Sequence, residues 1–188
     1  RHAQTPQTAR HGAWSMKREG KGPGDGIDER EEKAVNETAE AVLDEAKDGI
    51  ATLTMNRPGF NNAQNSQMTY ALDDAFRRAV DDDAVKVVVL RGAGKHFSAG
   101  HDIGTPGRDI DKPFERKHLW WDHTNKPGAE QLFAREQEVY LGLCRRWPAM
   151  PEPTLARVQG ACVPAGQVLA WGVDLVVARR APLVRGPG

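Results

Sequence analysis

Cysteine, charge excess of either sign and long apolar runs are all scarce in this 188-residue sequence. Two cysteines cannot form a disulfide framework, so a reducing compartment, the cytoplasm, is expected. Twenty-six basic residues balance 26 acidic ones, and this zero net charge argues against a nucleic-acid partner, whose binding depends on neutralising phosphates. The most apolar stretch, residues 161–178, is too interrupted to provide the roughly 20 apolar residues of a membrane span, so no membrane partner is expected.

What is present suggests one domain with a tail. Hydrophobic residues make up 39% of the chain and charged residues 28%, which is enough for one packed core. Residues 1–33 contain five glycines and two prolines, with 13 charged and almost no aliphatic side chains. Such a segment cannot bury enough apolar surface to offset its ordering entropy, so we predict a disordered tail. We assign residues 34–178 to one α/β domain and residues 179–188 to an atypical end.

The first half of this domain reads as strands around a helix. Asp48-Gly49 separates two β-rich runs, 39–46 and 49–55, and both turn residues tolerate positive φ, so a hairpin is predicted. From Ser66, the expected N-cap, apolar residues recur at helical spacing through residue 80. Residues 87–90 form a continuous apolar run, which is typical of a strand buried on both faces of a parallel sheet. Strand, helix and strand in this order predict a βαβ unit.

The second half contains shorter elements. Residues 104–128 include three prolines and are expected to form a loop, and residues 130–146 carry an apolar stripe that predicts a helix. A strand at 154–159, a short helix at 164–172 and a strand at 174–178 complete the prediction.

Two small-residue turns stand out as candidate binding elements. Residues 96–103 follow the strand at 87–90, and small side chains at 98–100 would let a ligand approach the backbone. Residues 159–166 lead into the helix at 164–172, where free N–H groups favour negative charge. One such turn is usually structural, but two that aim amides at one place have the layout of an oxyanion hole.

Other chemistry is weakly represented. The glycines of residues 92–94 lack the rest of a dinucleotide or phosphate-loop motif. His118 and His123 are five residues apart without further converging ligands, so no metal site is predicted; the tryptophans between them are expected to pack against a pocket. Cys162 has no neighbouring base and is interpreted as a buried structural thiol.

Several segments of the domain match the pattern of one known family. They are Leu53-Thr54-Met55-Asn56-Arg57-Pro58, Asn61-Asn62-Ala63, Leu72 and Phe76, Val88-Val89-Leu90-Arg91-Gly92, Phe97-Ser98-Ala99-Gly100-His101-Asp102-Ile103, and Val158-Gln159-Gly160 through Asp174-Leu175-Val176. On these segments, over residues 40–178, the sequence resembles the crotonase, or enoyl-CoA hydratase/isomerase, superfamily. The resemblance implies a partial crotonase-type ββα spiral, acyl-CoA substrates, and no cofactor beyond the coenzyme A that is part of the substrate.

The resemblance also implies roles for the two turns. The backbone N–H groups of His101 and Ala165 would form the oxyanion hole, although Pro164 replaces a family glycine beside the second donor. The carbonyls of Ala99 and His101 would face the adenine of coenzyme A. The remaining residues predicted to bind the coenzyme A or acyl part are Gly100, Asp102, Ile103, Gly104 and Gly166.

The proton-transferring residues of the family have no counterpart here. Val168 stands where family hydratases have one glutamate, and residues 179–188, where a second would be expected, contain no acid. We therefore expect a truncated chain with weak or no activity, nominally a hydratase. An isomerase, favoured if a single acid comes from elsewhere, and a non-catalytic acyl-CoA-binding protein remain alternatives. The family's trimers and hexamers imply a homo-oligomer for the full-length protein, with assembly compromised in this chain.

The side chain of His101 has two possible roles. Because the backbone would be the donor, the ring could cap the turn or bond Asp102 in a structural role. Alternatively, the imidazole, which titrates near neutrality, could relay the proton that Val168 cannot.

Overall fold

The computed structural model describes residues 40–179 and 183–184, so the predicted tail at residues 1–33 and most of the segment 179–188 lie outside the described residues. The strands are β1 (Val42–Lys47), β2 (Ile50–Met55), β3 (Val87–Gly92), β4 (Thr154–Val158), β5 (Ala161–Cys162), β6 (Leu175–Ala178) and β7 (Leu183–Val184). The α-helices are α2 (Ser66–Asp81), α3 (Ala129–Arg135), α4 (Gly142–Arg146) and α5 (Pro164–Trp171). Two 3-10 turns, Pro58–Phe60 and Trp147–Ala149, and the π-helical turn Glu136–Leu141 complete the list.

The predicted hairpin opens the domain. β1 and β2 pair antiparallel with Lys47 opposite Ile50. Asp48 and Gly49 have φ values of 52° and 80°, the two left-handed residues that this tight turn needs.

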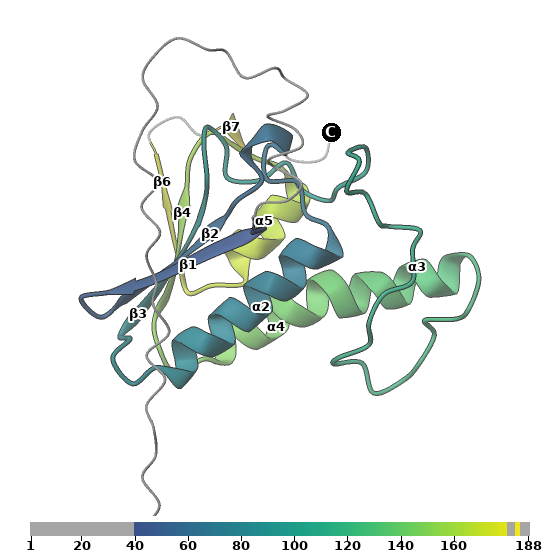
Figure 1. The fold of residues 1–188 in the computed structure, drawn as a ribbon, viewed down its shortest axis with the longest axis horizontal. Coiled ribbons are helices and arrows are strands. Elements are labelled where there is room, and N and C mark those ends of the chain that lie inside the picture. The colour runs from purple at the N-terminus through teal and green to yellow at the C-terminus, as the bar shows by residue number, and fades with distance from the viewer. Residues whose placement is uncertain (1–39, 180–182, 185–188) are drawn as a thin grey trace, which may run out of the picture.

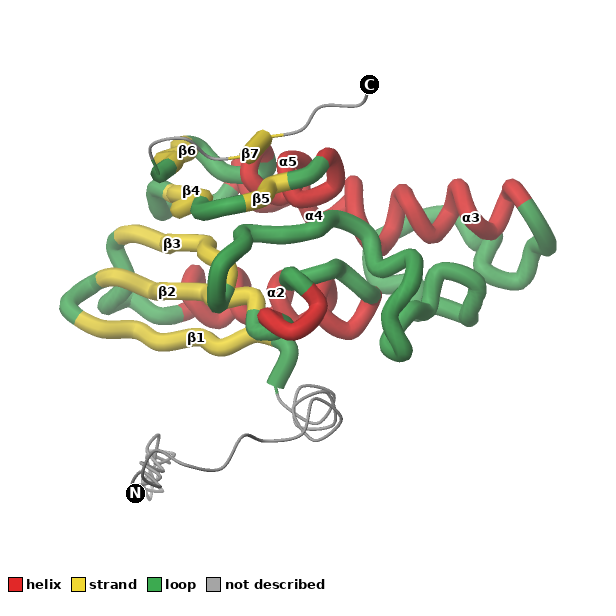
Figure 2. The backbone as a smooth tube through the Cα atoms, turned by 90° about the horizontal axis from the view of Figure 1, so that it is seen from above, coloured by secondary structure: helices red, strands yellow, loops and turns green. Residues whose placement is uncertain are grey.

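The five strands of the main sheet run in the order β1-β2-β3-β4-β6. Every pair except β1 with β2 is parallel, and α2 connects β2 to β3, which confirms the βαβ unit. Helices α2 and α4 lie along one side of this sheet, and α3 extends beyond it (Figures 1 and 2). β5 and β7 form a separate parallel pair beside α5 (Figure 2).

Helix α2 begins as predicted at Ser66, but its N-cap is the preceding residue. The Asn65 side chain accepts the N–H of Met68 at 3.0 Å, which satisfies a first-turn donor. Ser66 is the first helical residue, and its N–H donates to the Asp109 carboxylate on the long loop. The expected cap at Ser66 was therefore wrong by one residue.

The second predicted helix, at 130–146, is one continuous helical segment in three parts. α3 runs directly into the π-helical turn 136–141, which runs directly into α4. The sequence periodicity found this segment but not its π turn, because one extra residue per turn changes the apolar pattern only slightly.

The hydrophobic core occupies only one face of the main sheet. Along β3, Val88 and Leu90 are fully buried under the helices, whereas Val87 and Val89 are partly exposed. The prediction that this strand is buried on both faces was therefore wrong for the described part of the chain. All four residues of the edge strand β6 are exposed.

Candidate active site

The two turns singled out from the sequence lie side by side. Ser98 and Cys162 form a parallel β-bridge, and the N–H of Val163 donates to the Ser98 carbonyl at 3.2 Å. Phe97 donates across the same junction to the carbonyl of Ala161 at 3.1 Å. These bonds join the residues 96–103 turn to the start of α5.

Glycine allows the two turns to approach this closely. Gly100 has a φ of 84°, and a Cβ there would lie 3.3 Å from the Cβ of Ala165. A Cβ on Gly166 would lie 3.0 Å from both the Cβ and the carbonyl oxygen of Ser98. These two glycines therefore act by close packing between the turns.

Gln64, which the sequence analysis did not select, connects the two turns. Its N–H donates to the Gly100 carbonyl at 2.7 Å, and its carbonyl accepts the N–H of Asp102 at 2.8 Å. Its side-chain amide donates to the Ser98 hydroxyl at 2.9 Å and to the Ala165 carbonyl at 3.3 Å. The side chain is almost fully buried. Its position directly after Asn61-Asn62-Ala63, one of the segments that carry the family resemblance, was the sequence signal that could have revealed it.

This pairing leaves the N–H of His101 unpaired. Successive peptide groups of an extended chain point to opposite sides, so Gly100 and Asp102 face Gln64 while the His101 N–H points away from it. Ala165 is the second residue of α5, where a helix has no acceptor for its N–H. Within residues 40–179, neither N–H donates a hydrogen bond.

Both donors line one cavity of about 250 Å³. Two larger hollows lie elsewhere, one between β1 and α2 and one over the ends of β2, β3 and β4, and neither is lined by His101 or Ala165. We place the candidate site in the smaller cavity for that reason. Its walls are Gln64, His101, Glu136, Tyr140, Cys144, Pro164, Ala165, Val168 and Leu169.

Few of the side chains that line the cavity carry a charge at neutral pH. Burial raises the pKa of Tyr140 to about 12 and that of the Cys144 thiol to about 12, so both stay protonated at neutral pH. Val168 has no titratable group. Glu136 is the one carboxylate among the lining residues, and sequence reasoning missed it because it belongs to neither turn.

The ring of His101 faces Glu136 and Tyr140. Its Nε2 lies 3.7 Å from a Glu136 carboxylate oxygen, and its centroid lies 3.9 Å from that of Tyr140. Burial lowers the pKa of His101; the Glu136 charge opposes this shift and the nearby Arg135 adds to it. The expected bond from this ring to Asp102 does not form.

Asp102 instead belongs to a buried ion pair with Arg57, at 2.9 Å. Its carboxylate also accepts the backbone N–H and the hydroxyl of Thr105. Burial alone would raise the pKa of Asp102, but the hydrogen bonds from Thr105 and Arg57 outweigh it and lower the pKa. These contacts anchor the turn, and Asp102 does not line the cavity.

The other predicted binding residues are not among those that line the cavity. Ala99 donates its N–H to the Asn61 carbonyl, which secures the turn from its other side. Ile103 is 75% exposed, and Gly104 has open space where a Cβ would be. The structure thus brings His101 and Ala165 together in the cavity wall and leaves Ile103 and Gly104 at the surface.

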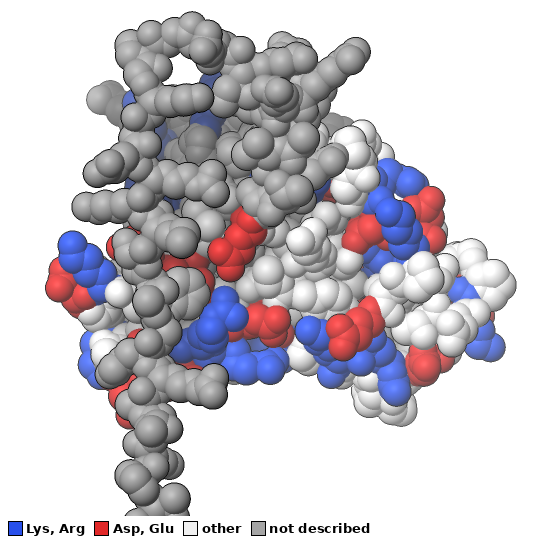
Figure 3. All heavy atoms as spheres, in the orientation of Figure 1, with Lys and Arg blue, Asp and Glu red and all other residues white. Residues whose placement is uncertain are grey.

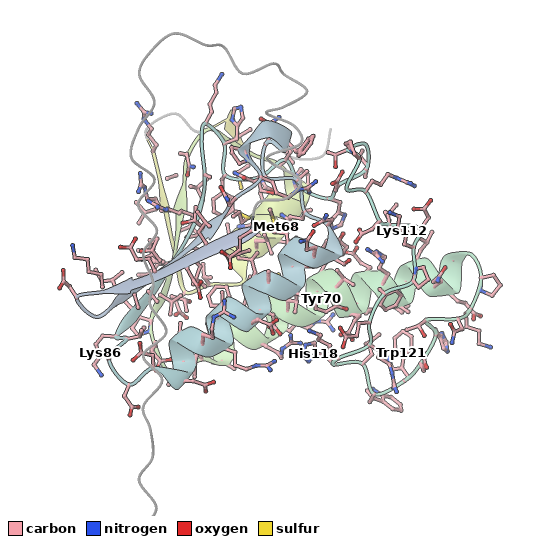
Figure 4. All side chains as sticks on the ribbon, viewed as in Figure 1. Met68, Tyr70, Lys86, Lys112, His118 and Trp121 are labelled. Carbon is pink, nitrogen blue, oxygen red and sulfur yellow. The ribbon has the colours of Figure 1, made fainter. Side chains whose placement is uncertain are left out.

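The cluster at residues 118–123 behaves differently from expectation. His118 lies beside α2 (Figure 4). It pairs with Asp73 of that helix at 3.3 Å, and Trp121 stacks on Phe133. Trp120 is 89% exposed, so the predicted packing of these tryptophans against a pocket was wrong for Trp120. The residues that the structure describes contain no group of three or more potential metal ligands.

Two further findings concern the thiol and the membrane. Cys162 is buried, and burial raises its pKa to about 11, as expected of a structural thiol. Among the helices in the described ranges, none is long and apolar enough to cross a bilayer.

Fold and site define a class of α/β protein in which two adjoining turns contribute to the wall of one cavity. A family model described as enoyl-CoA hydratase/isomerase matches residues 45–120. EchA13 of Mycobacterium tuberculosis, whose name places it among the enoyl-CoA hydratases, is 38% identical over 132 residues, covering 69% of this chain and 42% of that protein. The 1,2-epoxyphenylacetyl-CoA isomerase of Escherichia coli is 31% identical over 141 residues, 75% of this chain and 48% of that protein.

Solved structures agree with these matches. A crystal structure of an enoyl-CoA hydratase/carnithine racemase from Magnetospirillum magneticum matches with a TM-score of 0.65 at 30% identity, over 80% of this chain and 50% of that one. An enoyl-CoA hydratase/isomerase from Xanthobacter autotrophicus Py2 matches with a TM-score of 0.65 at 27% identity, again over 80% and 50%. The chain belongs to the crotonase superfamily, and it spans about half the length of the relatives that it matches.

Proposed function

We propose that the protein is an enoyl-CoA hydratase-like enzyme that acts on acyl-CoA thioesters. The observation that carries this proposal is that His101 and Ala165 line one cavity, while neither of their backbone N–H groups donates a hydrogen bond within residues 40–179. Gln64 bonds to both turns and so keeps the two donors in a fixed relation before any substrate arrives.

The chemistry explains why backbone amides suffice for the common step. Adding water to a 2-enoyl thioester, or moving a proton beside one, builds negative charge on the thioester oxygen. Preorganised donors stabilise that charge without reorganising during the reaction, and one such donor contributes about 2.7–4 kcal/mol. The N–H groups of His101 and Ala165 would therefore hold the enolate oxygen. No further cofactor is needed, because coenzyme A arrives as part of the substrate.

The substrate's coenzyme A part would lie along the residues 99–104 turn. In this arrangement the backbone carbonyls of Ala99 and His101 would face the adenine of coenzyme A. Support for access on this side comes from Ile103 and Gly104, which are open to solvent.

The direct test is to incubate the purified chain with crotonyl-CoA and to follow the absorbance of the conjugated thioester. Loss of absorbance with formation of the hydroxyacyl product supports the hydratase. Binding of crotonyl-CoA without turnover supports a non-catalytic acyl-CoA-binding protein, the reading that Val168 favours. A chain that does not bind acyl-CoA by calorimetry contradicts the proposal.

A specific observation favours isomerisation as the second candidate. The cavity wall contains one carboxylate, Glu136, whereas hydratases of this family use two glutamates. One carboxylate can remove a proton from one carbon and return it to another. The matching E. coli relative is named as an isomerase. Incubation with 3-hexenoyl-CoA and detection of the conjugated 2-enoyl product distinguishes this candidate from the hydratase.

We propose that the complete protein is cytoplasmic, does not bind nucleic acid or membranes, and assembles as a homotrimer or hexamer. The mixed distribution of Lys, Arg, Asp and Glu over the described part of the face in Figure 3 agrees with an absence of polyanion binding. Support for assembly comes from β6, where Leu175, Val176 and Val177 are all exposed, since apolar patches of this kind mark interaction sites. Light scattering tests it: Val177→Lys should reduce association, and an unchanged mass would count against this face.

A further inference from the structure

The π-helical turn Glu136–Leu141 contributes Glu136 and Tyr140 to the wall of the candidate site, and two of its side chains anchor the turn to other segments. Glu138 is fully buried, and its carboxylate accepts the backbone N–H groups of residues 117–119. Tyr140 donates its hydroxyl to the Gln64 carbonyl at 3.3 Å. Between these anchored residues and α3, Glu136 makes no such bond and lines the cavity. π turns recur at functional sites because they change the direction of side chains within a helix.

The sequence accommodates this turn specifically. A Cβ on Gly142, the first residue of α4, would lie 2.6 Å from the carbonyl oxygen of Gln137. Only glycine fits there without a shift of the backbone. The π turn is therefore supported by Glu138 within it and by Gly142 directly after it.

The surroundings keep Glu136 available as a base. The guanidinium of the preceding residue, Arg135, is paired with Asp109 at 2.7 Å, so it is engaged elsewhere. The distance of 3.7 Å between Glu136 and the His101 Nε2 is longer than a hydrogen bond. Because burial lowers the pKa of His101, its ring is neutral at neutral pH and does not form a permanent ion pair with the carboxylate.

The proposed base and one proposed oxyanion donor are therefore neighbours: the His101 ring lies beside Glu136, and the His101 backbone N–H is the donor. His101 lines the cavity, and the Nε2 of its ring lies 3.7 Å from the Glu136 carboxylate. Val168, which also lines the cavity, provides no proton-transferring group. The carboxylate that the two turns do not supply thus comes from a different part of the fold, the segment 129–146.

We propose that Glu136 is the proton-transferring catalytic residue of this site and that the His101 ring is its positioning residue. The proposal rests on the acyl-CoA function proposed above. In the hydration step, the Glu136 carboxylate accepts a proton from water as the water oxygen bonds to Cβ of the enoyl thioester. The π electrons of the Cα–Cβ bond move to the thioester oxygen, which the two N–H groups hold as an enolate. The enolate collapses as protonated Glu136 gives the proton to Cα, so one water is added and the carboxylate is restored.

The experiment uses two readouts, turnover of crotonyl-CoA and exchange of the Cα hydrogens of butyryl-CoA for deuterium in D2O. Exchange requires only binding, the oxyanion donors and a base, so it reports on Glu136 even where hydration is slow. In Glu136→Gln, which keeps the size of the side chain, we expect both rates to fall by about 100-fold or more. Binding of butyryl-CoA should stay within about twofold. Glu130→Gln, an exposed position in α3, is the matched control and should leave both rates unchanged.

The outcomes separate this proposal from the one on which it rests. A chain that binds no acyl-CoA overturns the proposed function and this inference with it. Exchange retained within about threefold in Glu136→Gln overturns the role of Glu136 alone. Binding with neither exchange nor turnover in the unaltered chain overturns the enzymatic function and the role of Glu136 together.

The positioning role of His101 has its own readout. In His101→Phe, which keeps a ring against Tyr140 but removes Nε2, we expect kcat to fall about tenfold with KM unchanged. In the Glu136→Gln background the same change should have no further effect, since residues that act as a unit are not additive. An equal effect in both backgrounds, or an effect on KM alone, contradicts it.

Discussion

Gln64 is the residue on which the geometry of the candidate site depends most. It is 1% exposed, and its backbone and side chain together bond to both turns. The distance from each N–H donor to the oxyanion must be correct to within about 0.2 Å. A single buried amide that bonds to both turns fixes the position of one turn relative to the other.

Replacing Gln64 with methionine keeps the volume but removes both side-chain hydrogen bonds. We expect the free energy of unfolding to fall by about 1–3 kcal/mol, because the Ala165 carbonyl loses a buried partner. Urea denaturation followed by circular dichroism measures this, and Gln67→Met on the exposed side of α2 is the control. Equal stability of the two variants would show that Gln64 is not a structural link.

His101 separates backbone from side-chain chemistry within one residue. His101→Ala keeps the N–H and should lower kcat only about tenfold, through the loss of its contact with Glu136. His101→Pro removes the proposed donor and should lower kcat by a further 100-fold or more. Steady-state kinetics on variants with confirmed folds measures both. Equal losses in the two variants would place the essential function in the ring.

At the scale of elements, the helical segment 129–146 shows how an irregular turn serves a site. Its apolar stripe predicted a helix, and the helix exists. The π turn within it was not predicted, since the apolar spacing across it matches that of an ordinary helix. The turn brings Glu136 to the cavity and anchors the long loop through Glu138.

Gly142→Ala tests this element. Alanine normally stabilises a helix relative to glycine by up to about 1 kcal/mol. Here the added Cβ would meet the Gln137 carbonyl at 2.6 Å, so we expect the opposite sign, a loss of about 1–3 kcal/mol. Thermal denaturation of this variant, with Gln67→Ala as the control, gives the sign directly. A more stable Gly142→Ala protein would mean that the π turn relaxes without cost.

At the scale of the whole molecule, buried polar contacts between distant segments hold the parts of the site together. Arg57 follows β2 and Asp102 follows β3, and their ion pair joins the ends of the two strands. Both side chains are nearly inaccessible to water, so loss of one partner leaves an uncompensated charge in the interior.

Asp102→Asn should destabilise the protein by about 3–5 kcal/mol at neutral pH. The folded pKa of Asp102 lies below its usual value, so its contribution is fully present above about pH 4–5 and is lost as pH falls through the folded pKa. The unaltered protein should therefore lose stability in acid more steeply than Asp102→Asn. Urea titrations at pH 7, 5 and 3.5 measure this difference. Parallel curves would show that the ion pair does not contribute.

Elements that arise from local causes could be predicted from the amino-acid sequence. Asp48-Gly49 specifies a hairpin because both residues tolerate positive φ, and the apolar spacing after Ser66 specifies a helix because it matches 3.6 residues per turn. The small residues at 98–100 and the turn at residues 159–166 likewise marked two candidate binding elements. Which of these features contact one another became clear only from the folded chain. Glu136 reaches His101 across 35 residues of chain, Gln64 joins both turns, and β6 lies exposed at the edge of the sheet. Such contacts join residues that are far apart in the sequence, and they form only when the long loop and the parallel sheet pack together. No local pattern of residues specifies which distant segments will pack.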